Sequence, residues 1–517
     1  MSKGKLNMRT RNTFYNSVSG IIYYLVNVFF GLISRKIIII YLGIEYQGIN
    51  GLFNNILSLL SIAELGIGTT IVYHLYKPFY EHDNSMIKPI ISFYKKCYIV
   101  IALIITILGI AVIPFLPHLI KDFDIPYSLS TIFLLYLSDT VFSYLFTHKR
   151  SLLIADQKNY LVNIFDIAYQ IFTKISQIFI IITTRNFIYY LVIAATFRLI
   201  ENFILNLVIN KKYAFIDSKN MDSLDNKILS DIKKKVRGTF LHKIGTFIVL
   251  GTDNIIISKF IGLTAVGIYS NYYLIINVIN NIFSQVISSA TASIGSMLNE
   301  QNEKKNCDIF EQLQLVNAAL VNTGSVSLYF LSTPFITWFF GDNYSLSNTV
   351  LLVLSLNFYV TGMRKVYVVF KEAAGVLYED RFIPLVESIL NITLSIILVK
   401  FLGMTGVFIG TILSSMILYC YTYPILVYKK ILKRKLNEYV KQLINFIGIL
   451  FLSFVCTEFV VKQIECTNIY FMFFLTAIVC LTVPSILFYL LYAKKNSAFV
   501  LLKQRLKVSR KNMPLVK

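Results

Sequence analysis

Polar and charged side chains lie along one face of a long apolar segment, residues 160–182. Their spacing of three or four residues is that of one helix face. A lysine or aspartate at the middle of a bilayer costs about 2.5–3.5 kcal/mol, so this face must turn towards other helices or water. Its carboxylate could bind a proton or a cation, and its ammonium could bind an anion. The residues on this face are Asn163, Asp166, Gln170, Lys174 and Gln177.

Similar polar positions interrupt other apolar segments in both halves of the chain. A serine or asparagine in a membrane helix often bonds a neighbouring helix for less than about 1 kcal/mol, and a terminal arginine can reach the interface. The pair Arg198 and Glu201, three residues apart, could be structural. The number of such segments favours a hydrated cavity between helices. The positions are Asn16, Asn27, Ser34, Arg35, Glu64, Arg198, Glu201, Lys243, Asp253, Asn277, Asn281, Glu387 and Asn391.

The composition indicates a membrane protein. Of the 517 residues, 56% are hydrophobic and 15% are charged, with a mean hydropathy of +0.65. Soluble domains carry about 25% charged residues. Because a helix of about 20 apolar residues spans the hydrocarbon core, we predict an all-α polytopic fold of fourteen transmembrane helices. The expected spans are 14–34, 49–73, 97–117, 126–147, 160–183, 187–209, 238–258, 265–297, 313–333, 346–363, 382–402, 404–428, 442–461 and 469–492.

The basic residues alternate between the two sides of the predicted membrane. Of 49 lysines and arginines, 39 fall in the N-terminal segment, every second loop and the C-terminal segment. Another 7 fall in the alternate loops and 3 inside spans. Since basic residues near membrane ends stay in the cytoplasm, both termini are expected there. The net charge of +22 therefore reflects topology, and we predict no nucleic-acid partner.

An internal repeat relates two parts of the chain. "YLGIEYQGI" (41–49) and "FIGLTAVGI" (260–268) share their glycines at a separation of 219 residues. Parallel repeats of this kind are a known transporter plan, with the binding site between the halves. We therefore predict two pseudo-symmetric six-helix lobes around a central cavity. The expected parts are an N-lobe at 1–210, a cytoplasmic loop at 211–237, a C-lobe at 238–430, and two further helices with a basic cytoplasmic tail at 431–517.

The chain lacks common signatures of enzymes and ATPases. It has no G-x-x-x-x-G-K-[ST] phosphate loop, and its six cysteines lack the C-x-x-C spacing of a metal site. Its five histidines form no catalytic motif with a cysteine or glutamate. We predict that the protein is not an enzyme and has no catalytic residues, cofactor or metal site.

Three blocks of sequence resemble a known family. Residues 41–83, from "YLGIEYQGINGLF" to "KPFYEHD", residues 251–275, "GTDNIIISKFIGLTAVGIYSNYYLI", and residues 375–415, from "GVLYEDRF" to "GTILSS", are similar to those of Wzx-type polysaccharide flippases. These flippases belong to the multidrug/oligosaccharidyl-lipid/polysaccharide exporter (MOP) superfamily. The resemblance covers most of the chain and is densest in these blocks.

The resemblance implies a function. Such proteins move undecaprenyl-diphosphate-linked oligosaccharide from the inner to the outer face of the bacterial cytoplasmic membrane, for capsule or O-antigen synthesis, by alternating access of two lobes. The implied partners are this lipid-linked glycan, the bilayer and the polysaccharide polymerase machinery. The two additional C-terminal helices resemble the lipid-II-flippase branch of the superfamily.

With this cargo, the polar positions acquire expected roles. Lys174, Arg198 and Lys243 would hold the diphosphate, since a guanidinium grips phosphate oxygens bidentately. The carboxyls of Glu64, Asp166 and Asp253 are candidates for coupling to a proton or a sodium ion, because a buried carboxyl can change protonation with conformation. The expected cavity residues are Arg35, Asn163, Gln170, Lys174, Arg198, Lys243, Asn277 and Asn281.

Two other functions stay open. Acidic residues inside the predicted spans outnumber the three basic ones, which suits a cation-coupled multidrug exporter of the same superfamily. A membrane glycan polymerase is a third reading, but such an enzyme needs a large outer loop, and the longest outer loops here have about 15 residues.

Overall fold

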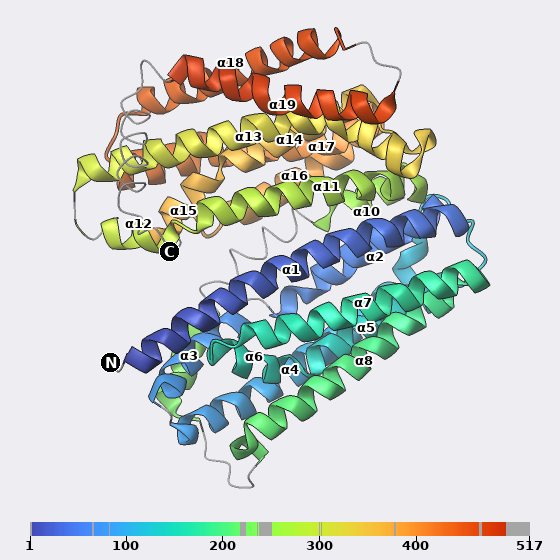
Figure 1. Cartoon of the computed structure of the whole chain (residues 1–517), viewed down its shortest axis with the longest axis vertical. Coiled ribbons are helices and arrows are strands. Elements are labelled where there is room, and N and C mark those ends of the chain that lie inside the picture. The colour runs from blue at the N-terminus through green and yellow to red at the C-terminus, as the bar shows by residue number, and fades with distance from the viewer. Residues whose placement is uncertain are drawn as a thin grey trace, which may run out of the picture. The chain divides into compact units, whose positions relative to one another are not determined.

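The chain divides into two helical units. The computed structural model describes residues 3–64, 67–81, 83–217, 224–234, 236, 251–298, 300, 302–376, 379–464 and 468–492 (Figure 1), and none of these lies in a β-strand. The first unit is Met1–Gly267 and the second is Ile268–Lys517. The predicted all-α fold is confirmed.

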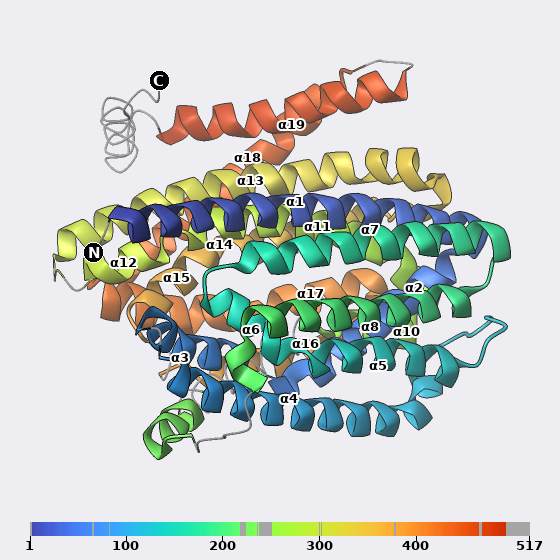
Figure 2. The same ribbon diagram turned by 60° about the horizontal axis from the view of Figure 1, so that its bottom comes forward.

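The first unit is built of long helices joined by short turns. Helices α1, α7 and α8 run side by side (Figures 1 and 2), with α5 packed on α8 and α4 on α5. Their apolar core joins buried residues from all of these helices, and Ile38 is the buried residue that α1 contributes. The helices are α1 (Lys3–Tyr41), α2 (Ile44–Leu60), α3 (Ile67–Glu81), α4 (Asn84–Val112), α5 (Leu129–Leu145), α6 (Thr147–Ala155), α7 (Asn159–Thr184), α8 (Phe187–Lys212) and α10 (Asp253–Phe260).

The second unit has two cores and a pair of C-terminal helices. Helix α13 packs against α14, α18 and α19, and α16 packs along α17. Helix α11 begins in the last residues of the first unit and continues into the second. The helices are α11 (Leu263–Ser288), α12 (Thr291–Leu298), α13 (Glu303–Phe340), α14 (Asn348–Met363), α15 (Lys365–Ala373), α16 (Ile383–Leu402), α17 (Met404–Ile417), the π-helix η5 (Leu418–Ile431), α18 (Leu436–Val461) and α19 (Ile469–Tyr492).

The helices are long and apolar enough for a protein that crosses the membrane many times. Ten of them within the described ranges meet this test, or eleven if the bent pair α5–α6 counts as one span. The predicted span 49–73 is divided between α2 and α3, and 238–258 is described only from residue 251. Helices α5 and α14 have only 17 and 16 residues. The count of fourteen therefore stays a prediction.

Helix starts recur at the separation that the sequence repeat showed. Helices α2 and α11 begin 219 residues apart, each directly after a glycine with positive φ, 114° at Gly43 and 130° at Gly262. Helices α4 and α13 begin at the same separation, and so do α5 and α14. The side chains of Asp83 and Asn302 cap α4 and α13 by accepting hydrogen bonds from backbone N–H groups of the first turn.

The repeated motif also makes a close helix contact within the first unit. A Cβ atom on Gly48 would lie 2.1 Å from the carbonyl oxygen of Leu263, and one on Gly267 would lie 2.4 Å from that of Ile44. The Thr264 hydroxyl donates a hydrogen bond of 2.9 Å to the Glu45 carboxylate beside them. Both glycines are therefore required because backbones approach at these positions.

The bend between α5 and α6 has a local cause. The axes of the two helices differ by 44°. The hydroxyls of Thr140, Ser143 and Thr147 each donate a hydrogen bond of 2.6–3.0 Å to a carbonyl three or four residues earlier. Such side-chain bonds to the preceding turn bend helices. The bend gives α6 its own direction, so that it contacts α3, α4, α7 and α8.

Candidate functional site

A network of five charged side chains lies among α5, α6, α7 and α8; we call it the ion network. Arg150 bonds Asp166 through Nη1 and Oδ1 at 2.7 Å and also pairs with Glu201. Arg198 reaches the other oxygen of Glu201 at 3.1 Å and lies 3.6 Å from Asp139. The Glu201 side chain is only 4% exposed. It therefore bridges two guanidinium groups inside the first unit.

Neutral side chains complete the ion network. The Asn202 amide donates to the carbonyl of Phe142 at 3.1 Å, and its oxygen accepts from Arg150 at 3.4 Å. The Tyr169 ring lies 4.0 Å from the Arg198 guanidinium carbon, which is a cation–π contact. These contacts hold both guanidinium planes in fixed orientations.

The ion network contains one more negative than positive group. With the three carboxylates ionised, its formal charge is −1, because only Arg150 and Arg198 oppose them. The sequence hypothesis assigned Arg198 to the diphosphate of a cargo. The structure instead places Arg198 in ion pairs with Asp139 and Glu201, so an anion would have to displace a carboxylate from it. The pairing of Arg198 with Glu201, left open by the sequence, is confirmed.

A second cluster surrounds Tyr190 on α8; we call it the Tyr190 cluster. The Lys174 ammonium donates to the Gln177 side chain at 3.1 Å and lies 5.7 Å from the centre of the Tyr190 ring. Gln177 in turn donates to the backbone carbonyl of Tyr190 at 2.9 Å. The Ser34 hydroxyl is 3.5 Å from the Tyr190 hydroxyl, and the neighbouring Arg35 is close enough to interact with that phenol.

Lys174 differs from Arg198 in what opposes its charge. Within the described ranges Lys174 forms no ion pair with a carboxylate, and its nearest polar partner is the neutral amide of Gln177. An ammonium has three N–H donors. The Tyr190 cluster therefore combines a cation with hydroxyl and amide groups, a set that can bind an anion or a polyhydroxylated ligand.

The polar residues of 160–182 therefore contact three different sets of groups. Asn163 donates to the Ser19 hydroxyl on α1 at 2.8 Å, Asp166 belongs to the ion network, and Lys174 belongs to the Tyr190 cluster. Gln170 is half-buried between the last two. The hydrogen bond of Asn163 joins two packed helices, which is the role that an asparagine in a membrane helix often has.

The three candidate coupling carboxyls occupy different environments. Asp166 is ion-paired, as described above. Asp253 is buried at the first residue of α10, where the helix dipole favours a negative charge. Glu64 ends the 3₁₀ turn Ser61–Glu64 between α2 and α3, and it accepts a hydrogen bond from the Tyr98 phenol on α4. Lys243, the third predicted cationic ligand, lies outside the described residues.

In the second unit, the polar residues of α16 are used in packing. Glu387 pairs with Arg364 at 2.8 Å and accepts from the Ser415 hydroxyl at 3.0 Å. Asn391 donates to Thr411 on α17 at 2.9 Å, and both side chains are buried. This stripe therefore lies in a helix contact, contrary to the expectation that it faces a hydrated cavity.

The polar residues of α11 are more accessible. Asn277 is half-buried and Asn281 is exposed. Between them, Asn280 accepts two hydrogen bonds from the Lys365 ammonium, at 3.0 Å on its backbone carbonyl and 3.3 Å on its side chain. Lys365 was not among the predicted residues, because it was counted with the topogenic charges of a loop.

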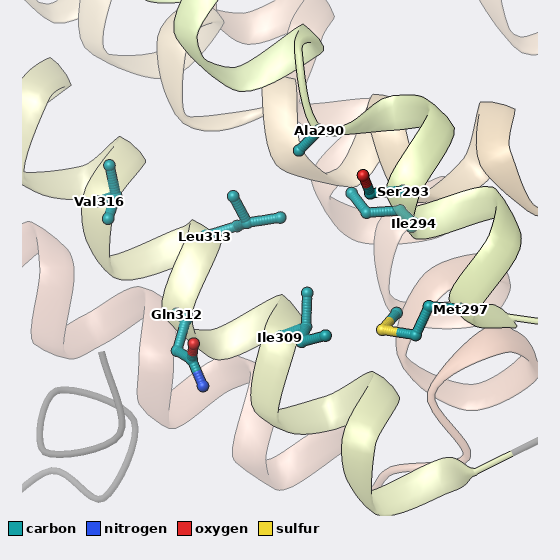
Figure 3. Close-up of a pocket in the computed structure, with 8 residues that line it drawn as sticks. All are labelled: Ala290, Ser293, Ile294, Met297, Ile309, Gln312, Leu313 and Val316. Atoms are coloured by element: carbon teal, nitrogen blue, oxygen red, sulfur yellow. The ribbon is translucent and has the colours of Figure 1, made fainter. Parts of the chain in front are cut away.

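A cavity of about 240 Å³ lies between α12 and α13 of the second unit, and Figure 3 shows its lining. Most of the side chains are apolar, and Ser293 and Gln312 are the polar ones. None of the residues predicted from the sequence lines it. The lining consists of Ala290, Ser293, Ile294, Met297, Ile309, Gln312, Leu313 and Val316.

Sequence reasoning missed two residues that organise the first unit, Arg150 and Tyr98. Arg150 follows the fourth predicted span and was counted among the cytoplasmic charges. It joins the ion network because α6 departs from α5 at the bend. The hydroxyl residues Thr140, Ser143 and Thr147 were the available signal for that bend, since they recur at helical spacing just before Arg150.

Comparisons with known proteins agree with this architecture. Residues 92–348 match a family described as "Polysaccharide biosynthesis protein". The lipid II flippase MurJ in an inward closed conformation superposes with a TM-score of 0.65 at 16% identity, over 92% of this chain and 98% of that one. This chain has the fold of the MOP superfamily.

Other MOP structures show the same likeness. An inward-facing multidrug resistance MATE family transporter matches with a TM-score of 0.56 at 15% identity, over 76% of this chain and 91% of the other. The MATE transporter VcmN of Vibrio cholerae matches with a TM-score of 0.57 at 15% identity, over 81% and 97%. No curated protein matches the sequence. The fold expected from the sequence is confirmed, and the long apolar helices within the described residues are those of a multi-pass membrane protein.

Proposed function

We propose that this MOP protein is a Wzx-type flippase that moves undecaprenyl-diphosphate-linked oligosaccharide from the cytoplasmic to the outer face of the bacterial cytoplasmic membrane. The observation that carries the choice of cargo is the match to polysaccharide biosynthesis proteins in a chain with the MOP fold. A lipid II flippase is also among the structures that cover nearly the whole chain. The proposal includes alternating access, cytoplasmic termini and no catalytic activity.

In this proposal the Tyr190 cluster contacts the diphosphate. Lys174 supplies an ammonium that forms no direct ion pair with a carboxylate among the described residues, and Arg35 on α1 supplies a guanidinium near the same phenol. A charge-assisted hydrogen bond is roughly twice as strong as a neutral one. Arg198 is assigned instead to holding α5 and α8 together through the ion network, while Lys243 keeps its predicted role as a cargo ligand.

In this proposal, side-chain amides are the groups that contact sugar hydroxyls. Gln170 is half-buried on the face of α7 that carries Lys174, and Asn277 and Asn281 are accessible on α11. An amide has two donors and an acceptor, so it can match hydroxyl groups of different orientation. This adaptability suits a transporter whose cargo is an oligosaccharide with many hydroxyl groups.

The proposal is tested by measuring flipping in proteoliposomes. The cargo is a fluorescent undecaprenyl-diphosphate oligosaccharide, and a membrane-impermeant quencher reports how much has reached the other leaflet. Loss of a charged hydrogen bond of about 1.5–3 kcal/mol predicts that Lys174→Gln weakens apparent affinity roughly tenfold to a hundredfold. Lys158→Gln is the matched control, because that lysine is at the start of the same helix and pairs with Asp156. Equal flipping by Lys174→Gln and the wild-type protein would exclude Lys174 as a cargo ligand.

A cation-coupled multidrug exporter is the second candidate, and the formal charge of −1 in the ion network favours it. The same vesicles distinguish the two functions when a fluorescent organic cation replaces the lipid-linked glycan. Accumulation of the cation without any glycan flipping would replace the flippase assignment. Lengthening of the glycan in these vesicles would instead indicate the polymerase.

A further inference from the structure

The cavity between α12 and α13 continues into a second hollow on the same two helices. The cavity has a volume of about 240 Å³ and the hollow one of about 490 Å³, and Ser293, Met297 and Ile309 line both. Figure 3 shows the two helices on opposite sides of the cavity, with Leu313 of α13 across from Ile294 of α12. The two spaces form one continuous site within the second unit, which we call the α12–α13 site.

The lining of the α12–α13 site changes from polar to apolar along the helices. The hollow lies where the chain passes from α12 to α13, and Ser296, Glu300 and Lys305 line it there. The cavity extends from this end to Leu313 and Val316 on α13. At a rise of 1.5 Å per residue, Lys305 and Val316 are separated by roughly 16 Å along the helix. The site therefore fits an amphiphile whose polar head lies in the hollow and whose hydrocarbon part lies in the cavity.

A buried amide in the cavity indicates what the amphiphile carries between its two ends. Gln312 lines the cavity and is 4% exposed, and its Nε2 has no hydrogen-bond partner within the described residues. A buried donor without a partner is costly, so this position favours a ligand with a hydrogen-bond acceptor. Because Gln312 lies between Lys305 and Val316 on α13, the acceptor belongs between the head and the hydrocarbon chain. The ester carbonyl of a phospholipid is such a group.

The size of the cavity is sufficient for part of a hydrocarbon chain. Cavities of roughly 150 Å³ with walls of leucine, isoleucine and phenylalanine already bind benzene. The cavity here is larger, at about 240 Å³, and most of its lining is apolar. It can therefore bury a segment of an acyl chain.

The charges of the hollow indicate the head group. Glu300 and Lys305 form an ion pair of 2.5 Å, and together their formal charge is zero. A head with one phosphate and one ammonium can contact both residues, the phosphate at Lys305 and the ammonium at Glu300. The diphosphate of a polyprenyl lipid would instead meet the like charge of Glu300. Such a lipid also has no ester carbonyl for Gln312.

We propose that the α12–α13 site binds a phospholipid with a zwitterionic ethanolamine head. One acyl chain occupies the cavity, an ester carbonyl accepts a hydrogen bond from Gln312, and the head lies between Glu300 and Lys305. In the predicted topology this end of the two helices is cytoplasmic, so the lipid comes from the inner leaflet. The inference goes beyond the proposed function and does not depend on the cargo, because this lipid is bound by the second unit and is not transported.

Photo-crosslinking of the purified full-length protein in phosphatidylglycerol nanodiscs tests the proposal. The probe is phosphatidylethanolamine with a diazirine in one acyl chain, added as a minor component. Mass spectrometry of the peptides gives the ratio of label on residues 290–316 to label on α19, whose exposed Leu481 and Leu490 report ordinary contact with lipid. We expect this ratio to fall when unlabelled phosphatidylethanolamine is added, and to stay unchanged with an equal amount of undecaprenyl diphosphate.

A substitution that fills the site should remove the specific label. Ser293→Phe places a ring where the cavity meets the hollow and should lower the ratio by about tenfold or more. The serine is exposed, so the larger side chain does not disturb the packed core. Ser288→Phe is the matched control, because Ser288 is exposed at the end of α11 and is not among the residues that line either space. Thermal unfolding verifies that both variants are folded.

The contact with Gln312 has its own test, in which the lipid is changed as well as the protein. Gln312→Leu should lower the ratio by about fivefold, which is the loss of one neutral hydrogen bond. Ether-linked phosphatidylethanolamine lacks the ester carbonyl, so it should compete about fivefold less well than the ester lipid against the wild-type protein. The two lipids should compete equally well against Gln312→Leu.

Three outcomes would overturn the proposal. An unchanged ratio in folded Ser293→Phe would place the label outside the α12–α13 site. Competition by undecaprenyl diphosphate as strong as that by phosphatidylethanolamine would make the polyprenyl lipid the occupant. Equal competition by the ester and ether lipids against the wild-type protein would exclude the carbonyl contact with Gln312. The assay includes no flipping, so a failure of glycan flipping in proteoliposomes would refute the proposed cargo and leave this site standing.

Discussion

Replacing Arg150 should clearly destabilise the first unit, because its guanidinium pairs with two carboxylates. Its side chain is 17% exposed, and it pairs with Asp166, which is 19% exposed, and with Glu201, which is 4% exposed. In Arg150→Met, Glu201 keeps Arg198 at 3.1 Å, but Asp166 loses its ion pair. Removing one partner of a buried pair costs about 3–5 kcal/mol. Because Asp166 is partly exposed, we expect the low end, about 3 kcal/mol.

The measurement is the free energy of unfolding in mixed micelles as the fraction of denaturing detergent rises, followed by circular dichroism. The double variant Arg150→Met/Asp166→Leu removes both charges, and replacing a whole buried pair by apolar groups is often nearly neutral. It should therefore be more stable than Arg150→Met alone by about 1–2 kcal/mol. Lys77→Met is the surface control, since that lysine is 81% exposed, and it should change stability by less than about 0.5 kcal/mol.

Two results would refute the reasoning. If Arg150→Met unfolds at the wild-type free energy, the ion network does not stabilise this unit. If the double variant loses the sum of the two single losses, Arg150 and Asp166 act independently and their 2.7 Å contact carries no coupling energy.

Two further perturbations test the fold itself. Gly48→Ala places a Cβ 2.1 Å from the Leu263 carbonyl oxygen and should lower the free energy of unfolding by about 1–3 kcal/mol. The control is Gly448→Ala, where no atom lies near the added Cβ, and it should be neutral or slightly stabilising. Equal stabilities of the two variants would contradict the close contact at Gly48. The Ser85 hydroxyl, with the backbone N–H groups of Met86 and Ser85, holds the pKa of Asp83 below its usual range. The cap on α4 therefore stabilises the fold above the unfolded-state pKa and is lost as pH falls through the folded-state pKa. Asp83→Ala should be less stable than the wild-type protein at neutral pH and equally stable in strong acid, while Asp83→Asn should keep its cap at both pH values. Thermal unfolding measured across this pH range tests the expectation. A destabilisation by Asp83→Ala that does not change with pH would refute the carboxylate cap.

Much of the candidate site could be predicted where partners are close in the sequence. The i, i+3 spacing of Arg198 and Glu201 already indicated a pair, and the face that holds Asp166 and Lys174 follows from the helical period alone. The partner of Asp166 could not be predicted in this way. Arg150 is 16 residues away in the sequence. It reaches Asp166 only because the chain bends between α5 and α6, where side-chain hydroxyls bond carbonyl groups of the preceding turn.

Polar stripes of similar appearance in the sequence have different surroundings in the structure. Asn391 bonds Thr411 inside a helix contact, whereas Asn281 is exposed. Both are asparagines in apolar helices, so residue type and spacing could not separate them. The distinction depends on which neighbouring helix covers each face, and that is a property of packing.

The sequence by itself determined that the chain is a helical membrane protein with a repeat of 219 residues, because hydropathy and glycine spacing are local properties of the polypeptide. It also determined which side chains could not face lipid. Only the tertiary structure decided that Asp166 is neutralised by Arg150 while Glu64 accepts a hydrogen bond from the Tyr98 phenol. The physical reason is that the state of a buried charge depends on the groups within a few ångströms of it, and these come from helices far apart in the chain.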